Sequence, residues 1–170
     1  MTDITQRAEE VLAQARNKGL MLATAESCTG GLVSAALTEI PGSSDVFDRG
    51  FATYSNAAKS ELLAVGADII DRFGAVSPQV AEAMAAGALS RSQASITVSI
   101  TGIAGPGGGS DGKPVGLVWF GVAQRDVPTR SVERRFGDVG RRAVREKSVE
   151  TALSLFLDAI EKAANKNGRS

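Results

Sequence analysis

A polar stretch of eight residues, 24–31, joins two apolar segments and constrains the fold of this chain most strongly. Residues 20–23 form an apolar run typical of a buried strand, and residues 32–40 repeat apolar side chains at helical spacing. The sequence therefore predicts a strand, a polar turn and the start of a helix. Such a junction leaves backbone N–H groups unpaired at the positive end of the helix dipole, which suits an anion or a developing oxyanion.

Three consecutive residues of this turn, Ser27, Cys28 and Thr29, carry potential nucleophiles. Serine and threonine immediately before a helix more often cap its N-terminus than perform chemistry. A thiolate at a helix N-terminus has a lowered pKa, so Cys28 is a rival to Ser27. From the turn alone, capping and catalysis both stay open.

The chain contains no histidine and a single cysteine. The absence of histidine excludes Ser-His-Asp and Cys-His catalysis together with every imidazole-ligated metal site. One cysteine can form neither an intramolecular disulfide nor a four-cysteine zinc site. We therefore expect no metal, no cofactor and a reducing, cytoplasmic location. If Ser27 is a nucleophile, its base must be a residue other than histidine.

Charge and length narrow the class of protein further. Nineteen basic and nineteen acidic residues balance, and aromatic residues make up only 5% of the chain. Neither nucleic acid nor a membrane surface is an expected partner of such a composition. The N-terminus lacks a signal-peptide core, and no apolar run is long enough to span a bilayer. The 170 residues are the size of one domain, which we place at 1–170 with a polar tail from about 163.

Helical and strand patterns alternate along the chain, which predicts an α/β fold with helices on both faces of a sheet. The last two predicted strands follow each other too closely for a helical crossover, so the sheet should be mixed and the two strands joined through residues 126–128. Strict alternation of apolar and hydroxylated residues predicts one core face and one row of small hydroxyls at 95–101. The predicted helices are 3–18, 32–40, a short one from 56, 68–73, 78–91 and 140–161, and the predicted strands are 20–23, 46–55, 95–101, 115–122 and 132–136.

A glycine-rich loop at 102–116 contains G-x-G-x-x-G and G-x-x-x-x-G-K patterns. Phosphate-binding loops with these patterns open a helix, and the second needs Ser or Thr after its Lys. Here Pro114 follows Lys113 and a strand comes next, so neither motif is supported. The glycines would let the backbone approach a ligand, form a mobile lid over a site, or simply make a flexible connecting loop.

Two further groups of residues are candidates for a base and for an anion clamp. Tyr54 ends a predicted strand and Lys59 follows it, so both reach the carboxyl-terminal sheet edge with Ser27 if the two strands are neighbours. The alternative is a solvated lysine and an ordinary strand aromatic. Arg141, Arg142 and Arg145 begin the last helix and would suit a phosphate, or equally a basic surface paired with nearby glutamates.

Four separated motifs resemble the CinA C-terminal domain family, whose members act as nicotinamide mononucleotide deamidases. The resemblance covers nearly the whole chain and implies a three-layer α/β/α sandwich on a mixed, mostly parallel sheet. It further implies a Ser/Lys amidohydrolase in which Ser27 is the nucleophile, Lys59 its general base and Tyr54 their neighbour. The matching motifs are residues 24–31 (TAESCTGG), 53–59 (TYSNAAK), 74–77 (GAVS) and 101–106 (TGIAGP) with 113–116 (KPVG).

The resemblance also implies the substrate contacts. The ligand would be surrounded by Thr101, Gly102 and Gly105, while Thr29, Gly30 and Gly31 would lie at the nucleophile. The family arginine motif is interrupted here by Val139 and Gly140, so either Arg141 or Arg142 takes the first arginine position, and Arg145 aligns with the second. Two-domain CinA proteins carry an additional N-terminal domain, so this chain resembles the stand-alone enzyme. As partners we expect a small-molecule nucleotide substrate and further copies of the chain in a homo-oligomer.

The hypothesis for the chemistry is an acyl-enzyme mechanism. Lys59 would deprotonate Ser27, which attacks the carboxamide carbon, and backbone N–H groups near Thr29 and Gly30 would receive the oxyanion. A lysine can act in this way only if its pKa falls substantially. The alternative function is a non-catalytic nucleotide-binding module linked to competence or DNA-damage responses.

Overall fold

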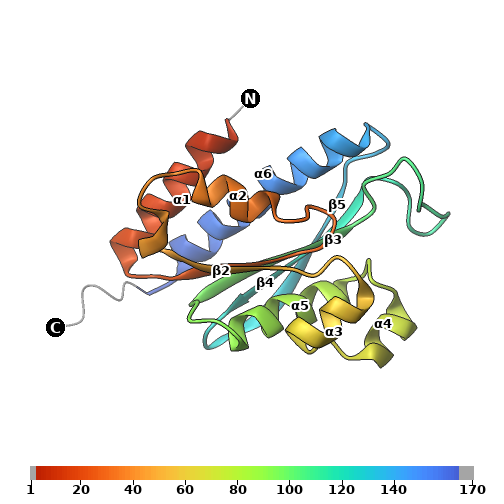
Figure 1. Cartoon of the computed structure of the whole chain (residues 1–170), viewed down its shortest axis with the longest axis horizontal. Helices are drawn as coiled ribbons and strands as arrows, with labels where there is room; N and C mark the ends of the chain where they lie inside the picture. The colour runs from red at the N-terminus through yellow and green to blue at the C-terminus, as the bar shows by residue number, and fades with distance from the viewer. Residues whose placement is uncertain (1–2, 165–170) are drawn as a thin grey trace.

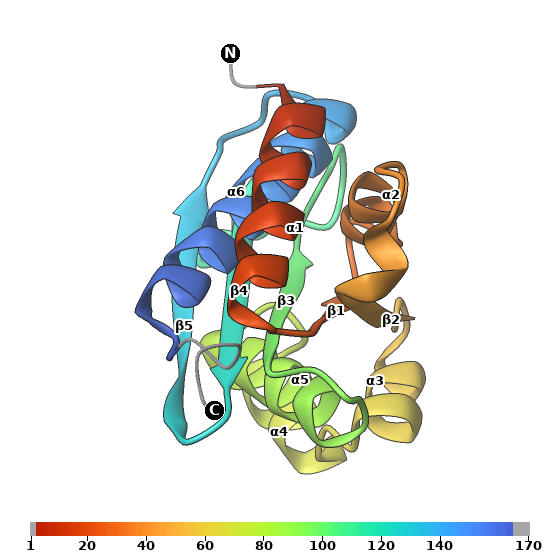
Figure 2. The same cartoon turned by 90° about the vertical axis from the view of Figure 1, so that its left-hand side faces the viewer.

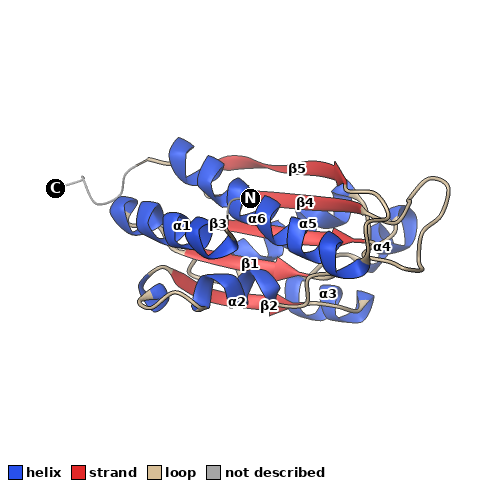
Figure 3. Cartoon of the chain, turned by 90° about the horizontal axis from the view of Figure 1, so that it is seen from above, coloured by secondary structure: helices blue, strands red, loops and turns tan. Residues whose placement is uncertain are grey.

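A five-stranded mixed sheet in the order β2-β1-β3-β4-β5 forms the middle of the molecule (Figure 3). The computed structural model describes residues 3–164, so residues 165–170 of the expected polar tail lie outside the described part. β1 pairs in parallel with β2 and β3, whereas β4 runs antiparallel to both β3 and β5. The strands are β1 Leu22–Glu26, β2 Phe47–Ala52, β3 Ile96–Gly102, β4 Leu117–Gln124 and β5 Val127–Arg135.

Helices cover both faces of this sheet, so the molecule has three layers (Figures 1 and 2). α1, α2 and α6 lie together on one face, and α3, α4 and α5 lie on the other. The predicted α/β class with a mixed sheet and two helical layers is confirmed. The helices are α1 Ile4–Lys18, α2 Leu32–Thr38, α3 Asn56–Leu63, α4 Ala67–Phe73, α5 Pro78–Ser90 and α6 Arg141–Lys162, with a short 3₁₀ helix η1 Ser43–Asp45.

Local sequence signals account for most helix boundaries. The side chains of Asp3, Ser55 and Ser77 each accept a hydrogen bond from a backbone N–H in the first turn of the helix that follows. Pro78 occupies the first helical position of α5, where its missing N–H costs nothing. Gly19 ends α1 in the left-handed conformation (φ 69°) that glycine adopts without strain.

The connection between β4 and β5 is shorter than predicted. β5 begins at Val127, five residues before the expected 132, and the turn consists of Arg125 and Asp126 rather than residues 126–128. Asp126 supplies the positive φ (63°) that this tight turn needs. Pro128 lies inside the strand because β5 is the edge of the sheet, where a missing N–H breaks no ladder bond.

The hydroxyl row of β3 is buried, not solvated. Thr97 and Ser99 donate hydrogen bonds to the carbonyl oxygens of Ala85 (2.7 Å) and Ala81 (2.5 Å) on α5. Thr101 donates to the carbonyl of Ala75 (2.8 Å) just before that helix. β3 is therefore enclosed on both faces, with aliphatic side chains toward α6 and hydroxyls toward α5.

Alternation along β1 sends neighbouring side chains into different layers. Leu22 packs in the core beneath α1 and α6, whereas Ala25 packs with residues of α3, α4 and α5. Glu26 follows the even-numbered residues toward α2, and Ser27 continues toward α3. Within residues 3–164, no helix is both long and apolar enough to cross a membrane.

Candidate active site

The carboxyl ends of β1, β2 and β3 meet at one sheet edge, as the sequence predicted for the candidate site residues. Ser27 follows β1, Tyr54 follows β2, and Thr101 and Gly102 end β3. These residues line a cavity of about 210 Å³ together with Lys59 from α3 and Arg141 from α6. The site is therefore assembled from three strand ends and the first turns of two helices.

Ser27 and Lys59 are in direct contact. The Lys59 Nζ lies 3.0 Å from the Ser27 Oγ, and the lysine side chain is only 1% exposed. The same Nζ donates to the carbonyl oxygens of Thr53 (3.0 Å) and Tyr54 (3.2 Å). A charged ammonium has three N–H donors, and these three acceptors satisfy all of them.

The two backbone carbonyls also orient the neutral form of the amine. A neutral amine keeps two N–H donors and gains one lone pair, so donation to Thr53 and Tyr54 directs that lone pair toward Ser27. Burial lowers the pKa of Lys59 below its usual 10.5, and the nearby Cys28 opposes this shift more weakly. The geometry aims the amine at the Ser27 hydroxyl, and the lowered pKa raises the fraction of Lys59 that is neutral and able to accept its proton.

Cys28 does not have the lowered pKa that its position before a helix suggested. Burial raises the pKa of its thiol to about 12, and the charge of Glu26 adds to this rise. Its own backbone N–H and the charges of Arg145 and Lys59 only partly oppose the shift. At neutral pH the thiol is therefore protonated and is a much weaker nucleophile than a thiolate.

The N-terminus of α2 is occupied by a side chain of the chain itself. The carboxylate of Glu26 accepts hydrogen bonds from the backbone N–H groups of Val33 and Ser34 in its first turn. An anion binding to this helix end would have to displace Glu26, so the anion site predicted there is not available. The sequence analysis missed Glu26, and the only signal for it was an acidic residue in the polar stretch that precedes a helix.

Ser27 lies in a turn of residues 27–31, here called the nucleophile turn, and hydrogen bonds of the other residues hold this turn in place. The Gly30 N–H donates to the Ser27 carbonyl (3.0 Å), and the Thr29 hydroxyl donates to Glu26. Arg145 reaches across from α6 and donates to the carbonyls of Cys28 (3.1 Å) and Thr29 (3.2 Å). Gly31 precedes α2 with a φ of 113°, which glycine adopts readily.

Neighbouring arginines at the start of α6 have different surroundings. Arg141 lines the cavity and donates to the Tyr54 hydroxyl (3.0 Å) and to the Gly105 carbonyl (2.8 Å). Arg142 points into solvent with a 92% exposed side chain and pairs with Glu146 at 2.7 Å. Of the two arginines, Arg141 is the one that faces the candidate site.

Residues that the sequence analysis did not single out also line the cavity. Asn56 begins α3 beside Tyr54 and offers a carboxamide to a ligand, while Val76 and Ala104 provide apolar wall. In the sequence, Asn56 was visible only as part of the 53–59 motif and as the start of a short predicted helix, which Ser55 caps. Gly102 leaves no room for a side chain, because an added Cβ would lie 2.7 Å from the Val118 side chain.

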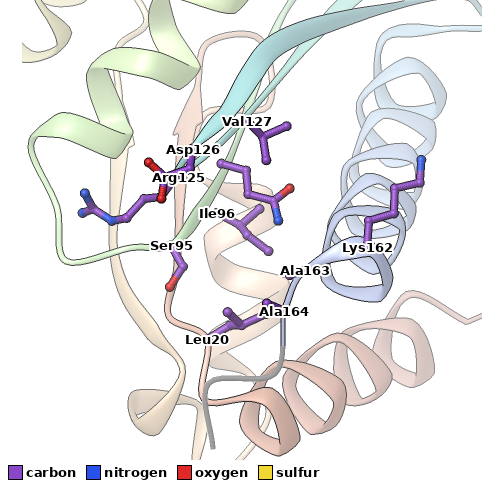
Figure 4. A pocket seen from close by; sticks show the side chains of 10 residues that line it. Leu20, Ser95, Ile96, Arg125, Asp126, Val127, Lys162, Ala163 and Ala164 are labelled. Carbon is purple, nitrogen blue, oxygen red and sulfur yellow. The ribbon is translucent and has the colours of Figure 1, made fainter. Parts of the chain in front are cut away.

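A second cavity, of about 330 Å³, lies near the amino ends of β1 and β3, where Leu20, Ser95 and Ile96 line it; Figure 4 shows it from close by. Its wall includes Ile96, Val127 and Lys162, and the charged ends of Arg125 and Lys162 point away from its centre (Figure 4). It contains no nucleophile held against a base. Among residues 3–164, no group of three or more Cys, Asp or Glu side chains is placed to hold a metal ion.

Comparisons with known proteins identify a matching family model and similar relatives. The model of the CinA C-terminal domain matches residues 4–160. The nicotinamide-nucleotide amidohydrolase PncC of Enterobacter agglomerans is 50% identical over 153 residues, which cover 87% of this chain and 92% of that protein. A CinA-like protein of Synechococcus sp. is 52% identical over 150 residues, but the match spans only 36% of that longer protein.

Solved structures with the same fold include two CinA-related proteins. The competence/damage inducible protein CihA of Agrobacterium tumefaciens has a TM-score of 0.91 at 51% identity, covering 95% of this chain and 98% of that one. A CinA superfamily protein of Escherichia coli has a TM-score of 0.87 at 33% identity, covering 92% and 90%. With a family match over almost its entire length, this chain belongs to the CinA C-terminal domain family.

Proposed function

We propose that this chain is a nicotinamide-nucleotide amidohydrolase that converts nicotinamide mononucleotide and water to nicotinic acid mononucleotide and ammonia. The observation that carries the proposal is the contact between the Ser27 Oγ and the buried Lys59 Nζ at 3.0 Å. The substrate is suggested by the relative PncC, whose name states this activity and whose length the chain nearly spans.

Acylation begins with the neutral amine of Lys59 taking the proton of Ser27. The Ser27 Oγ then attacks the carboxamide carbon, and the carbonyl oxygen becomes an oxyanion. The N–H of Gly30 already donates to the Ser27 carbonyl, so we assign the oxyanion to the N–H groups of Cys28 and Thr29. The Lys59 ammonium returns its proton to the departing nitrogen, which leaves as ammonia.

Deacylation uses the same pair in reverse. Lys59, neutral again, takes a proton from a water molecule that attacks the acyl carbon, and the C–O bond to Ser27 breaks. The proton on Lys59 returns to the Ser27 Oγ. The product carries a carboxylate in place of the carboxamide, and the enzyme is restored.

Substrate contacts follow from the cavity lining. Thr101 and Gly102 line it at the end of β3, and Tyr54 and Arg141, which are hydrogen-bonded to each other, line it as well. We place the phosphate at Arg141, whose guanidinium suits a phosphate oxygen pair. Thr29, Gly30, Gly31, Gly105 and Arg145 support the turn and the loop, and Arg142 lies outside the cavity.

The test is ammonia release from nicotinamide mononucleotide by purified variants. We expect Ser27→Ala and Lys59→Met to lose at least about a thousandfold in kcat, because each removes one member of a pair that acts as a unit. Methionine fills the buried lysine position without a charge. Wild-type rates in either variant would overturn the Ser/Lys assignment.

The rival functions have distinct outcomes in the same assay. Cys28→Ala is expected to retain turnover, and loss of ammonia release in that variant together with normal turnover in Ser27→Ala would point to the thiol. Tight binding of nicotinamide mononucleotide by wild-type protein with no product after long incubation would favour the non-catalytic nucleotide-binding module.

A further inference from the structure

Glu26 is a buried carboxylate beside the nucleophile that the proposed mechanism does not use. Its side chain is 1% exposed and points to the α2 layer, whereas Ser27 points to the α3 layer. Acidic residues are almost never fully buried unless their oxygens are paired. The hydrogen bonds of Glu26 therefore indicate what the residue holds in place.

Both carboxylate oxygens of Glu26 are saturated by donors from the nucleophile turn and α2. One oxygen accepts from the Thr29 hydroxyl (2.7 Å) and the Val33 N–H (2.8 Å). The other accepts from the N–H (3.0 Å) and the hydroxyl (2.9 Å) of Ser34. These four hydrogen bonds join Glu26 to the third residue of the nucleophile turn and to the beginning of α2.

Surrounding residues are adapted to this network. The Ser34 hydroxyl has one hydrogen, which it gives to Glu26, so the 2.7 Å contact with Thr24 must have Thr24 as the donor. Gly50 on β2 provides the space, since a Cβ there would overlap the Ser34 hydroxyl. The arrangement thus draws on β1, β2 and α2 together.

The backbone of Glu26 connects the same network to the base. Its carbonyl accepts from the Thr53 N–H (2.9 Å), and the Thr53 carbonyl in turn accepts from the Lys59 Nζ (3.0 Å). On the other side, the Ser27 N–H donates to the Ile100 carbonyl (2.9 Å). One residue therefore links the turn that carries Ser27 to the strand end that orients Lys59.

We propose that Glu26 is a positioning residue for Ser27. The Glu26 carboxylate fixes the turn so that the Ser27 Oγ stays hydrogen-bonded to the Lys59 amine. The inference rests on the proposed amidohydrolase function for its kinetic consequence. Its direct consequence, the reactivity of Ser27, can be measured without the nucleotide substrate. Displacement of a reacting atom by about 1 Å can cost roughly 100-fold in rate.

The decisive variant is Glu26→Gln. A glutamine has one acceptor oxygen, and in either orientation its NH₂ group would face a backbone N–H of α2, so the turn must shift. We expect kcat for nicotinamide mononucleotide to fall about 10- to 100-fold with little change in KM. Ser34→Ala, which removes one of the four bonds, should show a smaller loss of the same kind. A purely structural role would change the melting temperature but not kcat measured well below it.

The second measurement uses p-nitrophenyl acetate as the probe, with mass spectrometry to detect the acetyl group on Ser27. Glu26→Gln and Ser34→Ala are expected to acetylate Ser27 more slowly than wild type. Glu82→Gln is the matched control and should acetylate Ser27 at the wild-type rate. Glu82 lies on α5, accepts one hydrogen bond from Ser131 (2.9 Å) and is outside the cavity lining. Acetylation at the wild-type rate in folded Glu26→Gln and Ser34→Ala would overturn the inference.

The outcomes separate this inference from the proposed function. If wild-type protein acetylates Ser27 but releases no ammonia from the nucleotide, the proposed substrate is wrong while the acetylation rates still test Glu26. If wild-type protein deamidates the nucleotide and the variants match it in both assays, only the role of Glu26 fails. Should Glu26→Gln fail to fold, Ser34→Ala decides the result.

Discussion

Lys59 is a lysine held almost entirely out of water, although lysine is ordinarily a surface residue. Burial disfavours its charged form, while the three acceptors around Nζ keep that form hydrogen-bonded. The side chain can therefore exist in either protonation state without losing its position. A general base needs this property, because it alternates between the two states in every catalytic cycle.

The lowered pKa of Lys59 predicts the direction of the pH dependence. Only the neutral amine accepts the Ser27 proton, so kcat/KM should rise as pH rises through the lowered pKa and level off above it. The midpoint of this limb is expected below 10.5, the usual lysine value. The measurement is ammonia release from nicotinamide mononucleotide across a pH series with a stability check at each point. A rate that continues to climb beyond pH 10.5 would contradict a lowered pKa.

The sequence predicted which residues meet at the candidate site, but it did not predict the role of Glu26. The placement of Ser27, Tyr54 and Lys59 at one sheet edge follows from strand and helix order, which local patterns reveal. The role of Glu26 does not, because an acidic residue in a polar turn is ordinarily solvated. Its burial depends on how α2 folds back over β1, which is a property of packing.

At the scale of elements, the three arginines in the first two turns of α6 have different contacts. Arg141 faces the cavity, Arg142 faces solvent, and Arg145 is one helical turn further and holds the nucleophile turn. Successive residues of a helix point about 100° apart, so neighbours cannot share a ligand face. The sequence left Arg141 and Arg142 as alternatives because Val139 and Gly140 interrupt the family motif, and the residue order alone does not show which arginine faces the sheet.

For the phosphate, we expect Arg141→Ala to raise KM for nicotinamide mononucleotide by about 10- to 100-fold, the equivalent of losing a charge-assisted hydrogen bond. The phosphate-free riboside should be affected much less, since it offers no anion to the guanidinium. Arg142→Ala is the matched control and should leave both KM values unchanged. Equal losses for nucleotide and riboside in Arg141→Ala would remove that residue from phosphate binding.

The strands were predicted in the right order, but some of their boundaries were wrong: β1 was expected at 20–23 and is Leu22–Glu26, and β5 was expected from 132 and begins at Val127. The start of β5 was misplaced because Pro128 usually marks a break, and only its edge position makes it acceptable there. The hydroxyl row of β3 was recognised, but its partners were not. Alternation shows that two faces differ in polarity, and it does not show whether water or a helix covers the polar one.

At the scale of the whole molecule, α5 packs against the sheet with no room for a side chain at Gly121. Small residues Ala81 and Ala85 let β3 hydroxyls reach helix carbonyls, and the Gly121 N–H completes the Ser99 hydroxyl network at 3.0 Å. A Cβ on Gly121 would overlap the Ala81 carbonyl. Polar contacts, and not only apolar packing, therefore join this helical layer to the sheet.

Gly121→Ala is expected to destabilise the protein by about 1–3 kcal/mol, the usual cost of overpacking a filled interior. Urea unfolding followed by circular dichroism measures the loss. Gly112→Ala is the control, since a Cβ at that glycine has nothing within 4 Å and should change stability by no more than about 0.5 kcal/mol. Equal stabilities of the two variants would show that α5 moves away freely.

The acceptors of Lys59 differ in how far along the chain they lie. Thr53 and Tyr54 are six and five residues away, whereas Ser27 is 32 residues away. The proposed base and the carbonyls that orient it thus belong to one continuous segment, and the pairing of β1 with β2 brings that segment to the proposed nucleophile. Hydrolysis would then act as a built-in reporter of folding: a chain in which these two strands have not yet paired has no active serine, whatever else of its structure has formed.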